Sequence, residues 1–75
     1  MMLEALKNKI EEALPGATVQ VLDPMQDGEH LQAIVIYEGF EGKTLIEQHR
    51  MVTDPIKDEL KGPVHALAIK TKVRE

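Results

Sequence analysis

The sequence predicts an α+β fold in which helices cover one face of a three-stranded mixed sheet. Three observations predict it. Residues 1–14 are apolar at helical spacing, three later segments have the composition of strands, and two short helical segments separate the second strand from the third. Seventy-five residues suffice for one domain and no more, so we expect a single domain over residues 1–75.

The first predicted element is an amphipathic helix. Its apolar residues recur at three- and four-residue spacing, as one helix face requires: Leu3, Leu6, Ile10 and Leu14. Pro15-Gly16 ends the helix.

Strands are expected over residues 17–22, 31–37 and 64–72, where β-branched and apolar residues concentrate. Turn formers fill residues 23–29, which predicts an antiparallel hairpin between the first two strands. The second strand is almost continuously apolar, which indicates a strand that is covered on both faces or central in its sheet.

Two helices are predicted between the second and third strands. The first runs from Lys43 to Met51, with Leu45 and Val52 on one face. Asp54 immediately precedes Pro55. An aspartate at the N-cap followed by a proline at the first helical position is a common start of a helix, so a second, short helix is expected to begin there. A right-handed crossover through these helices makes strands two and three parallel. The resulting order, α-β-β-α-α-β, is that of a type II KH-like fold.

Composition excludes several functions. The chain has no Cys, which excludes disulfides, thiol nucleophiles and all-Cys metal sites. It has no Ser and no glycine-rich phosphate loop before a helix, so we expect no enzymatic activity. Its net charge of −4 argues against a general affinity for nucleic acids. No segment has the length of a membrane span and the start lacks a signal-peptide pattern, which predicts a cytoplasmic protein that does not bind membranes.

Several sequence blocks together resemble the BolA family. They occur in the family's order: Glu29–Leu31, Phe40–Leu45, His49–Val52 and Val64–Thr71. The sequence departs from the family pattern in two ways. The loop between the first two strands is short and lacks the Cys or extra His that relatives often carry, and no Trp-containing tail follows the third strand.

The resemblance implies a binding protein that partners a monothiol glutaredoxin of the Cys-Gly-Phe-Ser type. The two proteins would share a [2Fe-2S] cluster together with glutathione, in iron–sulfur trafficking or in iron, redox and stress regulation. His65 is implied to be a cluster ligand, and an imidazole in place of a thiolate raises the cluster potential. When alone, the chain is expected to be a monomer or a weak homodimer.

His65 and His30 are therefore the predicted metal ligands. Strand alternation places His65 on the face of Leu67 and Ile69, so a structural histidine near a strand end is the alternative. His30 is the natural second ligand in a chain without Cys, because parallel strands bring the starts of strands two and three to the same sheet edge. The alternative for His30 is a role in folding the hairpin alone. His49, in mid-helix, is predicted to pack.

Two further functions stay open. The family also implies DNA binding and transcription regulation through a two-helix unit that resembles a helix-turn-helix, with Lys43 and Arg50 as candidate phosphate contacts. Acidic residues such as Glu47 on the same helices favour an ordinary mixed surface instead. A third alternative is an adaptor that binds glutaredoxin without any cofactor.

Overall fold

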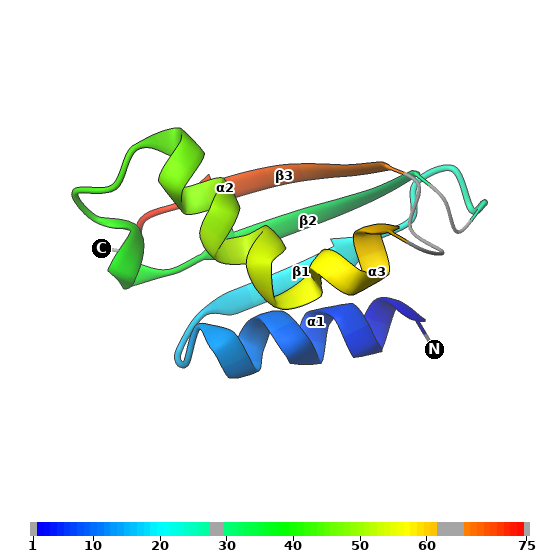
Figure 1. Ribbon diagram of the computed structural model, residues 1–75, viewed down its shortest axis with the longest axis horizontal. Coiled ribbons are helices and arrows are strands. Elements are labelled where there is room, and N and C mark those ends of the chain that lie inside the picture. Colours follow the sequence, from blue (N-terminus) through cyan, green and yellow to red (C-terminus); the bar gives the residue numbers. More distant parts are fainter. Residues whose placement is uncertain (1, 28–29, 62–65, 75) are drawn as a thin grey trace.

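The computed structural model describes residues 2–27, 30–61 and 66–74 of the chain (Figure 1). Its fold is α+β, as predicted. The helices and strands follow in the order α1 (Met2–Ala13), β1 (Thr18–Leu22), β2 (His30–Ile36), the 3₁₀ turn η1 (Glu38–Phe40), α2 (Leu45–Thr53), the 3₁₀ turn η2 (Asp54–Ile56), α3 (Lys57–Lys61) and β3 (Ala66–Lys72). None of the helices in the described ranges has the length and apolarity needed to cross a membrane.

The sheet has the predicted topology, with strand order β1-β2-β3. β1 pairs antiparallel with β2, and β2 pairs parallel with β3. The register joins His30 to Ala66 at one end and Ile36 to Lys72 at the other. The N-terminal ends of β2 and β3 therefore meet at the same edge of the sheet, where the sequence predicted the ligands.

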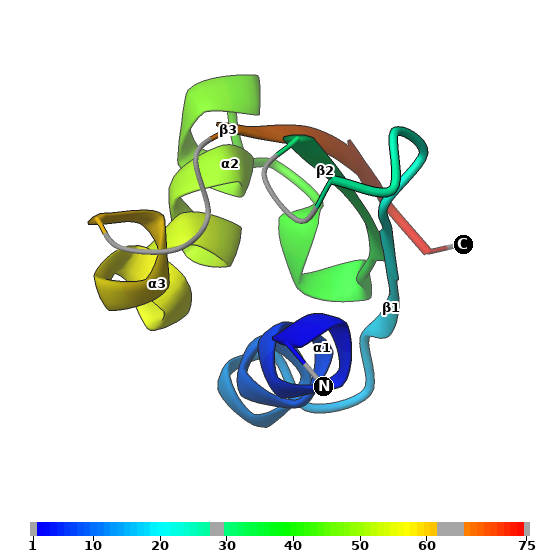
Figure 2. The ribbon, with the colours of Figure 1, turned by 90° about the vertical axis from the view of Figure 1, so that its right-hand side faces the viewer.

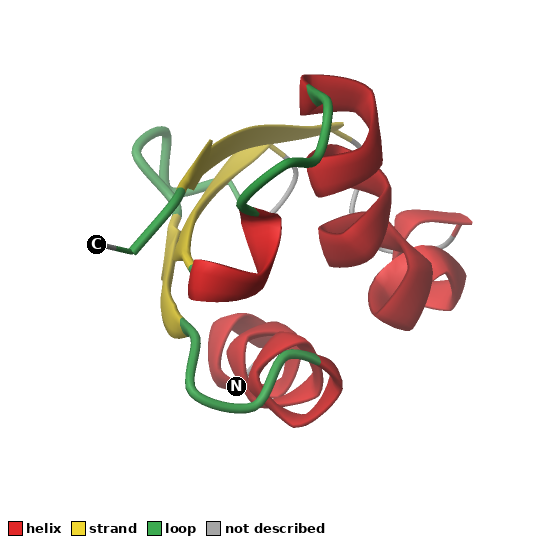
Figure 3. Ribbon diagram, turned by 90° about the vertical axis from the view of Figure 1, so that its left-hand side faces the viewer, coloured by secondary structure: helices red, strands yellow, loops and turns green. Residues whose placement is uncertain are grey.

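All the helices that the structure describes lie on one face of the sheet, and none of them covers the other face (Figures 2 and 3). Along β2, the residues that face the helices are buried, whereas those between them are half-buried or exposed. β2 is therefore central in the sheet and covered on one face, which decides between the two alternatives that its apolar sequence left open.

The core lies between the covered sheet face and the helices. Phe40 is fully buried there, and its ring meets that of Tyr37 edge-on, with centroids 5.3 Å apart and an interplanar angle of 86°. Figure 2 shows η1 inside the curve of the sheet, between the strands and the helices. The other largest buried side chains come from every layer: Leu6, Ile10, Ile56, Val35 and Val52.

Two local predictions about the helices are wrong. Leu45 does not share the buried face of Val52: it is 63% exposed, because α2 begins only at that residue and its first turn projects beyond the core. Asp54 is not an N-cap. Its backbone is helical, so the chain passes from α2 through η2 into α3 without the extended residue that a cap needs.

Candidate functional site

The candidate site is the sheet edge where β2 and β3 begin and the loop after β1 ends. The backbone of His30, the first residue of β2, lies opposite Ala66, the first residue of β3. His65 immediately precedes Ala66 in the sequence but lies outside the described residues. Its predicted role as a ligand, and the predicted meeting of the two imidazoles, therefore stay predictions.

Aspartates hold the loop that leads into His30. The Gln26 N–H donates to the Asp23 carbonyl oxygen (3.1 Å), and the Asp27 N–H donates to the Asp23 carboxylate (3.3 Å). Gln26 has a positive φ of 55°, which the tight turn requires. Asp27 then accepts the His30 N–H at 3.0 Å. Short-range bonds of this kind are typical of aspartates in turns, and here they fix the backbone at the start of β2.

The same Asp27 carboxylate also fixes the His30 ring. Its Oδ2 lies 2.8 Å from Nδ1 of the imidazole. A carboxylate only accepts hydrogen bonds, so Nδ1 carries the proton and the lone pair of the neutral ring is at Nε2. Histidines that bind metals commonly have their second ring nitrogen held by a carboxylate in this way, which sets the tautomer and the ring orientation. The pair is thus chemically suited to metal ligation through Nε2.

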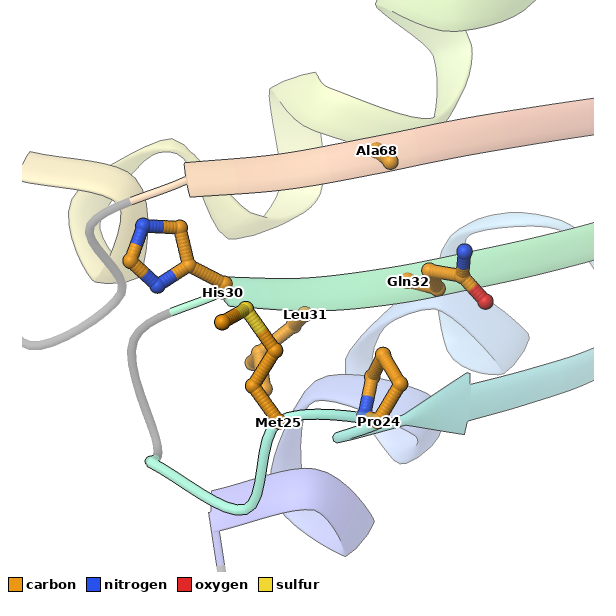
Figure 4. A pocket seen from close by; sticks show the side chains of 6 residues that line it. All are labelled: Pro24, Met25, His30, Leu31, Gln32 and Ala68. Atoms are coloured by element: carbon orange, nitrogen blue, oxygen red, sulfur yellow. The ribbon is translucent and has the colours of Figure 1, made fainter.

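His30 is accessible as well as oriented. Its side chain is 48% exposed, and it borders a shallow pocket of about 230 Å³. Figure 4 shows Met25 beside His30 at the start of β2, with Gln32 and Ala68 farther along the two strands. The lining is mainly apolar and comprises Pro24, Met25, His30, Leu31, Gln32 and Ala68. A partner that reaches His30 would therefore also contact apolar surface.

The other candidate residues lie away from this edge. His49 is half-buried in the middle of α2, and Arg50 is exposed in the last turn of that helix. Lys43 is exposed in the loop just before α2. Within the described ranges, no three His, Cys, Asp or Glu side chains are grouped to hold a metal ion.

Sequence reasoning missed Asp27. The signal was present, because an aspartate three residues before a strand-initiating histidine can bond to that residue's backbone. The second bond, to the imidazole ring, depends on the turn geometry at Gln26 and is visible only in the structure.

Comparison with known proteins identifies the family. The family model described as "BolA-like protein" matches residues 7–75. This chain belongs to the BolA-like protein family. It is 33% identical to mouse BolA-like protein 1 over 91% of this chain and 55% of the relative. The chain thus spans about half the length of that mammalian relative.

Other BolA-like proteins match in sequence or in structure. The Escherichia coli protein named DNA-binding transcriptional regulator BolA is 27% identical over 95% of this chain and 74% of its own length. The solved BolA domain of SufE1 from Arabidopsis thaliana superimposes with a TM-score of 0.84 at 28% identity, covering 96% of this chain and 91% of that domain. The BolA-like fold is therefore shared almost from end to end.

Proposed function

We propose that this BolA-like chain is a non-enzymatic, cytoplasmic binding protein. It docks with a monothiol glutaredoxin and supplies imidazole ligands to a [2Fe-2S] cluster that the two proteins share, in iron–sulfur trafficking or in iron and redox regulation. The observation that carries the proposal is the 2.8 Å contact between His30 Nδ1 and the Asp27 carboxylate at an exposed edge of the sheet. Family membership supports it, because His65 stands in the sequence block that implies a ligand.

The histidines of this chain are suitable ligands for such a cluster. His30 is oriented to bind through Nε2, and His65 comes one residue before the register partner of His30 in the sequence. The partner's Cys and the glutathione bound to it would supply the thiolates. A histidine-ligated iron gives the cluster a higher reduction potential than four thiolates do.

The proposal is tested by co-purifying the chain with a monothiol glutaredoxin and recording visible absorption and circular dichroism. His65→Ala and His30→Ala should each alter the cluster spectrum. His49→Ala, which removes an imidazole from the middle of α2, away from this edge, should leave the cluster spectrum unchanged. A wild-type pair that purifies without any cluster would contradict the shared-cluster role, and an unchanged spectrum in both histidine variants would contradict the ligand assignment.

DNA binding is the second candidate function, and the E. coli relative's name favours it. Lys43 and Arg50 are exposed at the two ends of α2, where they are available to phosphates. The geometry offers limited support, because α3 has five residues and Glu47 lies between the two cations. The function predicts duplex binding that weakens steeply with salt and is lost when Lys43 and Arg50 are both changed to Glu. Absence of binding at low salt would exclude it.

A further inference from the structure

The face of the sheet that carries no helix is an extended surface with its own chemistry. We call it the open sheet face. Strand alternation assigns to it the residues that lie between the buried positions, namely Thr18, Gln20 and Leu22 of β1, Gln32, Ile34 and Ile36 of β2, and Ala68, Lys70 and Lys72 of β3. Figures 2 and 3 show no helix over this face.

The open sheet face is apolar at its centre. Ile34 and Ile36 lie on the middle strand and are half-buried. Leu22, on the neighbouring strand, is 41% exposed. Because isolated exposed apolar residues are common, the informative feature is that these three share one uncovered surface.

The charges on this face are all positive. None of the three strands contains an Asp or a Glu, although the chain has 13 acidic residues and a net charge of −4. Lys70 lies opposite Ile34 in the register, and Lys72 lies opposite Ile36. Both lysines are exposed, and neither forms an ion pair with the residues that the structure describes. The acidic residues within the described ranges lie instead on the helices and loops.

The open sheet face is continuous with the candidate site. Gln32 and Ala68 are register partners that belong to this face and also line the pocket beside His30. Lys70 is two residues farther along β3 than Ala68, a step of about 6.6 Å, and Lys72 is a second such step away. A protein that reached His30 from this side would lie over both lysines.

The chemistry of the face favours one class of occupant. Single-stranded nucleic acids bind to sheets mainly by stacking bases on aromatic side chains, and no Phe, Tyr or Trp lies on these strands. The chain's aromatic residues, Tyr37 and Phe40, pack on each other in the core. A two-fold contact with a second copy would bring like-charged lysines together. An apolar protein surface edged with carboxylates complements both the isoleucines and the lysines.

We infer that the open sheet face docks an acidic-edged surface of the partner protein that brings the cluster to His30. This inference rests on the proposed function and adds to it the surface by which the partner is held. The helices on the opposite side then stay uncovered in the complex.

Charge reversal tests the inference. Calorimetry measures the Kd for apo monothiol glutaredoxin of the wild type and of two double variants. Lys70→Glu/Lys72→Glu changes the open sheet face. Lys57→Glu/Lys61→Glu is the control, because it changes two exposed lysines of α3 and alters the net charge by the same amount. We expect binding to the β3 variant to weaken roughly tenfold at low salt and the control to change less than about twofold. The difference should shrink as salt screens the charges.

A second pair of variants tests the apolar centre. Ile34→Thr keeps a β-branched residue in the strand and should weaken binding, whereas Ile46→Thr removes an isoleucine that is 65% exposed on α2 and should not. On titration with unlabelled glutaredoxin, amide shifts of the ¹⁵N-labelled chain should concentrate in β2 and β3.

The outcomes separate this inference from the proposed function. Equal Kd values for the two charge-reversal variants, or shifts confined to α2 and α3, would overturn the docking surface and leave the shared cluster intact. No binding to wild-type protein would overturn both. Preferential binding of a single-stranded oligonucleotide to this face, or a homodimer that the Lys70→Glu/Lys72→Glu change disrupts, would overturn the choice of occupant.

Discussion

The two ends of β2 differ in what holds them. At its C-terminal end, the Tyr37 N–H donates to the Lys72 carbonyl (2.9 Å), and Arg74 donates to the Gly16 carbonyl (2.7 Å) and to the Thr18 hydroxyl. At its N-terminal end, His30 and its loop are fixed by short-range bonds to aspartates and stay exposed. In Figure 1 these ends lie at opposite sides of the molecule.

This difference indicates that the C-terminal end of β2 contributes to the stability of the fold and the N-terminal end to partner binding. The C-terminal end leads into η1, which contains the fully buried Phe40, and the bonds there join segments that are distant in sequence. The N-terminal end exposes the His30 imidazole, the Met25 side chain and a shallow, mainly apolar pocket. Substitutions at the first end should therefore change the free energy of unfolding, and those at the second should change partner binding.

Phe40→Ala should give the largest effect. Removing a fully buried aromatic side chain leaves a cavity between the sheet and the helices, and should lower the free energy of unfolding by about 3–5 kcal/mol. Chemical denaturation measures it. Met25→Ala is the matched control at the opposite end, where the side chain is 66% exposed, and it should change stability by less than about 0.5 kcal/mol. Equal losses of unfolding free energy in the two variants would contradict the different roles of the two ends of β2.

Asp27→Asn should give the next effect, on the cluster and not on stability. An asparagine oxygen can still accept the His30 N–H, but its NH₂ group then faces Nδ1 and favours the tautomer with the proton on Nε2. Loss of such a supporting carboxylate typically weakens metal binding about 10- to 100-fold. Competition with an iron chelator measures the loss. Asp23→Asn is the control, and an equal loss there would contradict the role of Asp27.

The smallest effect concerns the ion pair between Lys9 of α1 and Glu59 of α3. The Lys9 ammonium, through its hydrogen bond, holds the pKa of the Glu59 carboxyl below its usual 4.5. The stabilisation is thus present above pH 4.5 and is lost as the pH falls through the lower folded-state pKa. Wild type should therefore lose its small stability advantage over Glu59→Gln in acid. An advantage that grew below pH 4.5 would contradict this sign.

Sequence alone predicted the sheet because its signals are local and redundant. β-branched residues, the turn formers of residues 23–29 and the helical crossover each constrain the topology, and together they bring the starts of β2 and β3 to one edge. They also selected His30, because that prediction needed only its position at the start of a strand.

The missed features depend on how neighbouring elements meet. Thr44 and Glu47 form a reciprocal capping box, and α2 begins at Leu45, two residues later than expected, although the T-x-x-E pattern was readable in the sequence. Asp54 looked like an N-cap because it precedes Pro55, but the chain stays helical there. The ring contact of Asp27 depends on a left-handed residue at Gln26, which composition does not reveal.

The most direct test of the central claim is to detect the His30 nitrogen at the iron. The chain is labelled with ¹⁵N-histidine, paired with unlabelled monothiol glutaredoxin and reduced, and pulsed EPR then records nitrogen nuclei coupled to the cluster spin. We expect strong ¹⁵N coupling in the wild type and loss of one coupled nitrogen in His30→Ala. Identical ¹⁵N couplings in the two proteins would contradict it.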